Sequence, residues 1–119
     1  MNTYQVHALT ALGDPTRRAI FETLADHPRS VGEIAREFPV SRPAVSQHLK
    51  VLKGAGLVVG RRAGNRCIYS IDLDGVSTLR AYFEQFWNKA LAAYKVAVEQ
   101  RRKELTWPNR SKRRPYELT

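Results

Sequence analysis

Residues 30–66 constrain the fold of this chain more than any other segment. They read SVGEIAREFPVSRPAVSQHLKVLKGAGLVVGRRAGNR. Ser30 and Glu33 have the spacing of a capping box, in which each side chain satisfies a free backbone amide of the other residue at the start of a helix. Pro39 ends this short helix, because the residue before a proline is pushed out of helical geometry. The segment therefore opens with one short capped helix.

A second helix is predicted over residues 41–55, with Ser41 as its N-cap and Pro43 in its first turn. Its apolar residues recur at helical spacing and define one buried stripe, formed by Ala44, Val45, Leu49 and Leu52. The opposite face is polar and carries Arg42, Ser46, Gln47, Lys50 and Lys53. Side chains of these types hydrogen-bond to base edges and phosphates.

A basic hairpin follows this second helix. Gly56 is suited to the left-handed conformation that ends many helices. Residues 57–62 and 66–71 then read as two strands around Ala63-Gly64-Asn65, which is a hairpin turn signal. A short helix, a tight turn, a second helix and a hairpin are the parts of a winged helix-turn-helix. The predicted fold is mostly α with a β-hairpin wing.

The distribution of charge points to the same function. Residues 36–66 carry seven basic side chains and one acidic side chain, and residues 101–119 carry seven basic and two acidic ones. The remaining segments, 1–35 and 67–100, each have a net charge of −1, so all of the net +9 lies in the helix-turn-helix, the hairpin and the tail. Clustered positive charge is what phosphate binding requires.

The length and composition of the chain limit the number of domains that it can form. With 119 residues, 43% of them hydrophobic, we expect one winged helix-turn-helix domain over residues 1–103, followed by a basic, flexible tail over residues 104–119. A single cysteine cannot form an internal disulfide, which favours a reducing cytoplasm. No stretch is long and apolar enough to span a bilayer, so we expect no export and no membrane partner.

Two further helices precede the helix-turn-helix. The first is predicted over residues 3–12, with Tyr4, Leu9 and other apolar contacts. Gly13 ends it, and Asp14 then caps a second helix whose first residue is Pro15, a favoured position for proline.

A long C-terminal helix is predicted from Val76 to about Arg102, after Asp72 and Asp74, which are read as helix caps. At about 1.5 Å per residue it approaches about 40 Å, which is longer than a domain of this size can cover. The first half is expected to join the core, and the second half has nothing left to pack against in one chain. We therefore expect a homodimer whose seam includes Tyr4, Leu9, Phe86, Trp87, Leu91, Tyr94 and Val98.

The motifs in combination resemble the ArsR-type winged helix-turn-helix transcriptional repressors. The similar segments are ALGDPTRRAIFETL, the Ser30 capping box and VSRPAVSQHLKVLKGAGLVVGRRAGNRCIYSI, and the resemblance covers residues 4 to about 98. It implies a homodimer that represses by occupying an operator in double-stranded DNA. It also implies a recognition helix at residues 41–55 in the major groove and a wing at residues 61–66.

The candidate DNA-binding residues follow from the polar face and this resemblance. They are Ser41, Arg42, Pro43, Ser46, Gln47, His48, Lys50, Lys53, Arg61, Arg62, Asn65 and Arg66. Gln47 is the best candidate for bidentate reading of adenine, and Arg42 is suited to bases or to phosphate. His48 contacts a phosphate or packs against its own helix, and we favour the contact. Two recognition helices related by a dyad predict an inverted-repeat operator.

Metal sensing is not expected, and no cofactor is predicted. The first helix of the motif has no cysteine, and no histidine occurs after His48, so the ligand sets that thiolate or imidazole sites need are missing. The aromatic final helix, YFEQFWNKALAAYK, is also similar to that of a branch of the family that lacks metal-sensing cysteines and histidines. Cys67 is read as a small buried apolar residue, and Arg66 beside it keeps a redox role open.

Two other classes were weighed against a DNA-binding regulator. No nucleophile elbow, phosphate-cradling glycine loop or paired carboxylates occur, so an enzyme is not expected and no catalytic residue is assigned. A winged helix used for protein–protein contact, or a metal- or redox-responsive sensor of the same family, stays an alternative. The sequence does not specify the operator, the regulated genes or any small-molecule effector.

Overall fold

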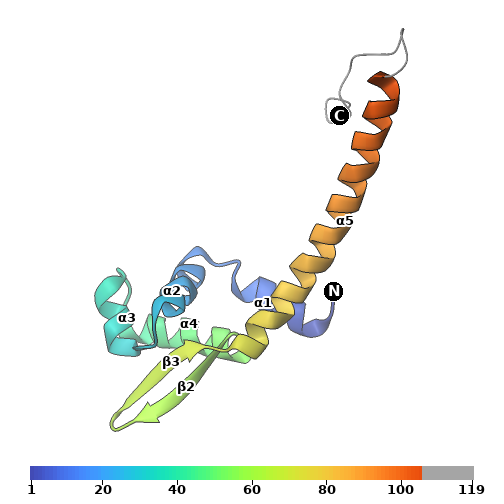
Figure 1. The fold of residues 1–119 in the computed structure, drawn as a ribbon. Helices are drawn as coiled ribbons and strands as arrows, with labels where there is room; N and C mark the ends of the chain where they lie inside the picture. The colour runs from blue at the N-terminus through green and yellow to red at the C-terminus, as the bar shows by residue number, and fades with distance from the viewer. Residues whose placement is uncertain (106–119) are drawn as a thin grey trace. The chain divides into compact units, whose positions relative to one another are not determined.

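The computed structural model describes residues 1–105 and confirms a mostly helical fold with a hairpin wing (Figure 1). The elements in chain order are α1 (Thr3–Ala11), α2 (Pro15–Asp26), β1 (Arg29–Ser30), α3 (Val31–Glu37), α4 (Arg42–Gly54), β2 (Val58–Ala63), β3 (Arg66–Ile71) and α5 (Leu73–Leu105). The chain divides into two compact units, Met1–Tyr82 and Phe83–Thr119. The tail predicted at 104–119 falls mostly on residues 106–119, which lie outside the described residues, while Glu104 and Leu105 belong to α5.

Local capping sets the starts of the helices in the first unit, as the sequence predicts. The Asp14 carboxylate accepts a hydrogen bond from the Arg17 amide at 3.0 Å, and Pro15 opens α2. At α3, Glu33 N donates to Ser30 Oγ at 3.2 Å, and Ser30 N donates to the Glu33 carboxylate at 3.0 Å. This reciprocal pair is the predicted capping box.

The core of the first unit gathers apolar side chains from all of its helices. It contains Ala8, Ala11, Ile20, Leu24, Ile34, Val45, Leu49, Leu52, Leu57, Val58 and Leu79. Val45, Leu49 and Leu52 are fully buried, so the predicted apolar stripe of α4 is confirmed. Because this stripe faces inward, the opposite polar face of α4 is directed to solvent.

The three strands form an antiparallel sheet in the order β1-β3-β2. The two-residue strand β1 was not predicted, because two residues carry no readable periodicity. Its pairing of Arg29 with Tyr69 and Ser30 with Ile68 attaches the wing to the start of α3. Ala63 pairs with Arg66, so the turn contains two residues, one fewer than expected, with Gly64 at a φ of +64°.

Gly56 and Gly75 allow two segments distant in sequence to touch. Gly56 has a φ of +77°, as predicted for a left-handed cap. A Cβ added at Gly75 would lie 1.6 Å from the Gly56 carbonyl oxygen, so only glycine fits there. The start of α5 therefore packs directly on the backbone that leaves α4.

The long helix α5 begins at Leu73, three residues earlier than predicted. Asp72 is the cap, and its carboxylate accepts from the Asp74 amide at 3.0 Å. The expectation that Asp74 is also a cap is wrong, because Asp74 lies in the first turn of the helix. Leu79 is the last residue that α5 contributes to the core, so the core segment is shorter than the predicted first half.

In the second unit, the described part is the remainder of α5, from Phe83 to Leu105. Phe86, Trp87 and Tyr94 are 63%, 64% and 65% exposed. Leu91 is half-buried and Val98 is exposed. Trp87, Leu91, Tyr94 and Val98 lie three or four positions apart, so they share one helix face, and Phe86 lies at its edge.

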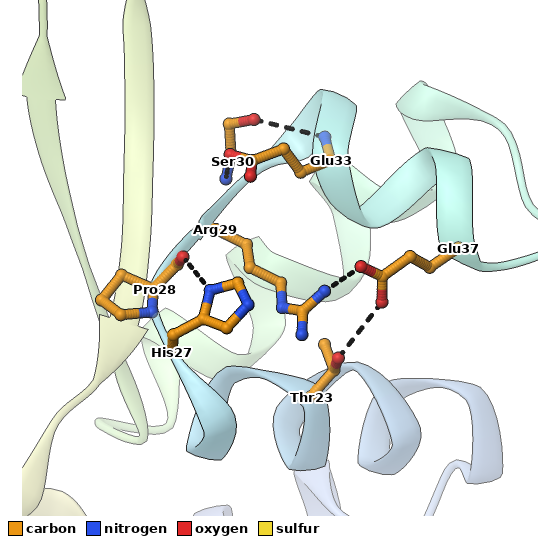
Figure 2. Close-up of polar contacts among 7 residues, drawn as sticks. All are labelled: Thr23, His27, Pro28, Arg29, Ser30, Glu33 and Glu37. Atoms are coloured by element: carbon orange, nitrogen blue, oxygen red, sulfur yellow. Dashed lines mark hydrogen bonds and ion pairs between the residues drawn. The ribbon is translucent and has the colours of Figure 1, made fainter.

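An ion pair joins α3 to the sheet in the first unit (Figure 2). The buried Arg29 donates through Nη1 to the Glu37 carboxylate, which also accepts from Thr23 Oγ1 at 3.4 Å. Arg29 Nε is buried and has no hydrogen-bond partner among the described residues. Glu37 is therefore the group that compensates the buried charge of Arg29.

The close approach at Gly75 predicts a loss of stability when a methyl group is added. Gly75→Ala should lower the free energy of unfolding by about 1–3 kcal/mol, because the Gly56 backbone must move. Gly54→Ala is the matched control, since an added Cβ there meets nothing within 4 Å. Urea unfolding followed by circular dichroism measures both; equal stability of the two variants would contradict the contact.

The Arg29–Glu37 pair predicts a second loss of stability. Glu37→Ala should lower the free energy of unfolding by about 1–3 kcal/mol, because Arg29 is left as an unpaired buried charge. Glu22→Ala is the control, since its contact with Arg18 is 3.9 Å long and exposed, and such pairs contribute about 0–1 kcal/mol. If both variants unfold at the same urea concentration, the buried pair is not stabilising.

Candidate DNA interface

The exposed face of α4 presents five polar side chains from one rigid helix. Arg42, Ser46, Gln47, Lys50 and Lys53 are all exposed. Within residues 1–105, none of these side chains makes a hydrogen bond or ion pair with another residue. Their donors and acceptors are therefore available to a ligand, while the buried stripe beneath fixes their spacing.

Ser41 and Pro43 lie at the exposed start of the same helix. Ser41 Oγ accepts a hydrogen bond from the Ala44 amide at 3.3 Å, so this hydroxyl acts as the N-cap. Pro43 lies in the first turn, where its missing amide hydrogen costs nothing. Both residues orient the N-terminal end of α4, and their predicted contact with DNA stays a prediction.

His48 differs from its neighbours on α4. It is half-buried, and its Nδ1 atom is buried without a hydrogen-bond partner among the described residues. The pKa of Asp14 is lowered mainly by the hydrogen bond from the Arg17 amide, and the charge of His48 contributes to this shift. His48 therefore lies near the start of α2, and its phosphate contact stays a prediction.

The hairpin places its arginines on two different faces. Arg61 pairs with Ile68, and Arg62 pairs with Cys67. Because neighbouring residues of a strand point to opposite sides, the Arg61 and Arg62 side chains leave the hairpin on opposite faces. Both are exposed, so the wing offers positive charge on both sides of its tip.

The structure brings three predicted residues from separate elements together. Arg42 at the start of α4 and Asn65 and Arg66 at the hairpin tip line one cavity of about 230 Å³. Arg36 of α3 lines it too, and sequence reasoning missed this residue as a site residue. Its only sequence signal was its place in the basic segment 36–66.

Glu33 is the acid beside this group of arginines. Its carboxylate lies 3.7 Å from Arg66 Nη1. The pKa of Glu33 is lowered, mainly by the hydrogen bond from the Ser30 amide and also by the nearby charge of Arg66. Glu33 therefore stays ionised and joins the capping box to the hairpin.

Cys67 and Tyr69 lie side by side on the hairpin opposite Gly60. A Cβ at Gly60 would come within 2.9 Å of Cys67 Sγ and 3.1 Å of the Tyr69 ring, so glycine makes room for both. Burial and the hydrogen bond with Cys67 raise the pKa of Tyr69. Cys67 is half-buried, less enclosed than the buried residue that the sequence predicts, and its redox role stays a prediction.

Among residues 1–105, no three His, Cys, Asp or Glu side chains lie close enough together to hold a metal ion. Over the same residues, no helix has both the length and the apolar character required to cross a bilayer.

Comparison with known proteins supports the DNA-binding interpretation. Residues 12–61 match the model of a helix-turn-helix domain family. The chain is 52% identical over 101 residues to the HTH-type transcriptional regulator Rv2034 of Mycobacterium tuberculosis, covering 83% of this chain and 94% of that protein. It is 34% identical to the transcriptional repressor SdpR of Bacillus subtilis, covering 66% of this chain and 88% of SdpR.

A solved structure supports the assignment of the winged helix-turn-helix fold. The homodimeric winged helix-turn-helix DNA-binding domain of Mb0332 from Mycobacterium bovis, described as a possible ArsR-family transcriptional regulator, matches with a TM-score of 0.58 and 32% identity. The match covers 71% of this chain and 80% of that domain. The chain thus belongs to the ArsR-type family of winged helix-turn-helix transcriptional regulators, which act by binding DNA and are not enzymes.

Proposed function

We propose that this regulator is a homodimeric repressor that occludes an inverted-repeat operator. The observation that carries the proposal is the exposed polar face of α4, whose side chains are unpaired within residues 1–105, beside a hairpin with arginines on both faces. A helix of this kind fits the major groove, and the hairpin reaches the flanking backbone or minor groove. A bound dimer would block access of other proteins to the same DNA.

The residues of the interface have different tasks in this proposal. Gln47 reads an adenine through its amide, and Ser46 and Arg42 contact neighbouring bases or phosphates. The remaining predicted contacts bind the phosphate backbone and position the helix: Ser41, Pro43, His48, Lys50, Lys53, Arg61, Arg62, Asn65 and Arg66. Their basic members supply affinity through counterion release, without sequence preference.

Dimerisation is proposed through the exposed apolar face of α5. Phe86, Trp87 and Tyr94 are each more than 60% exposed, and soluble monomers rarely expose contiguous apolar patches beyond a few hundred Å². Tyr4, which is 73% exposed on α1, is a second apolar contact available to a partner. The homodimeric state of Mb0332 supports this assignment. The predicted seam comprises Tyr4, Leu9, Phe86, Trp87, Leu91, Tyr94 and Val98.

A twofold dimer determines the form of the operator. An isologous interface relates the two α4 helices by a dyad, so the two half-sites are inverted and about one helical turn apart, roughly 34–36 Å. The repressor name of SdpR supports repression as the outcome. We place this activity in the prokaryotic cytoplasm, on nucleoid DNA, because that is where such an operator lies.

The base-reading role of Gln47 is tested on an operator selected from random duplexes. Gln47→Ala should cost about 1–3 kcal/mol on the selected operator and much less on a scrambled duplex, because one bidentate base contact is lost. Fluorescence anisotropy with both duplexes measures the difference. An equal loss on both would show that Gln47 only positions the helix.

Arg62→Ala should affect DNA binding differently from Gln47→Ala. A phosphate contact carries no sequence information, so its loss should weaken both duplexes alike and reduce the slope of log K against log salt by about 0.9. An unchanged slope would place Arg62 away from DNA.

The dimer is tested by Tyr94→Asp. An aspartate in the seam would bury a charge without a partner, so we expect this variant to sediment as a monomer, keep its helical circular dichroism and lose specific binding. Val96→Asp is the matched control, since Val96 is 62% exposed on α5 but lies off the apolar stripe. A monomeric wild type at micromolar concentration would refute the dimer; a dimeric Tyr94→Asp would move the seam to α1.

A further inference from the structure

The cavity between the helix-turn-helix and the wing contains an unusual concentration of positive charge. It measures about 230 Å³, and its lining includes Arg36 of α3, Arg42 of α4 and Arg66 of β3, with Asn65 and Cys67 beside them. A cavity of about 150 Å³ already holds a benzene molecule, so a tetrahedral oxyanion fits easily. The elements α3, α4 and β3 therefore bring three arginines to one ion-sized space.

Two of these three arginines have no acidic partner among the described residues. Arg36 and Arg42 make no ion pair or side-chain hydrogen bond with any residue of the described part of the chain. The third, Arg66, is exposed and forms an ion pair with the half-buried Glu33, whose carboxylate lies 3.7 Å from Arg66 Nη1. Like charges that converge around a cavity repel one another, and a bound anion removes this repulsion.

The glycine at position 32 is independent evidence that the Arg42 guanidinium is kept beside the cavity. A Cβ at Gly32 would lie 3.0 Å from Arg42 Nη2 and 3.4 Å from its Cζ atom, so the guanidinium rests directly on this glycine. Glycine inside a helix is unfavourable, because it loses more backbone freedom than alanine. Its presence in α3 thus leaves room for the Arg42 guanidinium beside the cavity.

We propose that this cavity binds one phosphate group of the DNA backbone, with Arg36, Arg42 and Arg66 as its ligands and the Asn65 amide as a further donor. Guanidinium groups suit this task, because their planar donors match phosphate oxygens in pairs. The contact links α3, α4 and the wing through one phosphate, and it adds Arg36, outside the recognition helix, to the interface. The inference rests on the proposed DNA-binding mode and specifies one of its contacts.

Gly32→Ala tests the site without removing any charge or donor. The added methyl group displaces the Arg42 guanidinium, so we expect affinity for operator and scrambled duplex to fall by about threefold to tenfold, with a salt slope reduced by up to about 0.9. Gly54→Ala is the matched control, because an added Cβ there meets nothing within 4 Å. Circular dichroism checks that both variants are folded. Wild-type affinity and slope in Gly32→Ala would contradict the role of Arg42.

Arg36→Gln tests the residue that sequence reasoning missed. It should weaken both duplexes alike and reduce the salt slope by about 0.9. Lys95→Gln removes the same charge from the exposed surface of α5 and should leave the slope unchanged. If the two variants behave identically, the effect of Arg36 is that of net charge and the site is refuted.

Cys67 provides a direct probe of occupancy, because it lines the cavity and is the single cysteine of the chain. We expect duplex DNA to slow the alkylation of Cys67 by iodoacetamide several-fold in the wild type and not in Arg36→Gln. Protection by millimolar inorganic phosphate, with none from bound duplex, would assign the cavity to a free anion and overturn the backbone contact. Tight DNA binding without any protection would refute the phosphate site and leave the proposed repressor function intact.

Discussion

The structure depends on burial of the apolar stripe of α4. Val45, Leu49 and Leu52 are completely excluded from solvent, and each buried side chain of this size contributes about 1.5–3 kcal/mol. This burial fixes the rotation of α4 about its own axis, so Gln47, Lys50 and their polar neighbours must face outward. The same contacts that stabilise the domain therefore determine which side chains can reach DNA.

Tight backbone contacts hold the remaining elements of the first unit around α4. Gly56 and Gly75 let the start of α5 rest on the backbone that leaves α4. The short strand β1 and the Arg29–Glu37 pair attach the wing and α3 to the same framework. Because these attachments involve backbone pairing and a buried charge, the wing is held in a defined register beside α3, and the basic groups of both elements share one cavity.

The distribution of charged side chains is not explained by folding stability alone. Three arginines around one cavity repel one another, and the polar face of α4 is left without partners in the described residues. Such an arrangement favours the binding of phosphate. The exposed apolar stripe of α5 favours contact with a partner, which is why we propose a dimer bound to DNA.

The sequence alone determined the starts of α2, α3 and α4, the inward stripe of α4, the hairpin and the family, because capping boxes, helical periodicity and glycine turns are local signals. It also indicated twelve candidate DNA-binding residues, of which eleven prove exposed and His48 is half-buried. Only the tertiary structure decided the rest. The strand β1 is too short to show a pattern, the close approach of Gly75 to Gly56 joins two elements, and the place of Arg36 beside Arg42 and Arg66 depends on how three elements meet. Contacts between separate elements leave no periodic pattern in the sequence, so only the tertiary structure shows them.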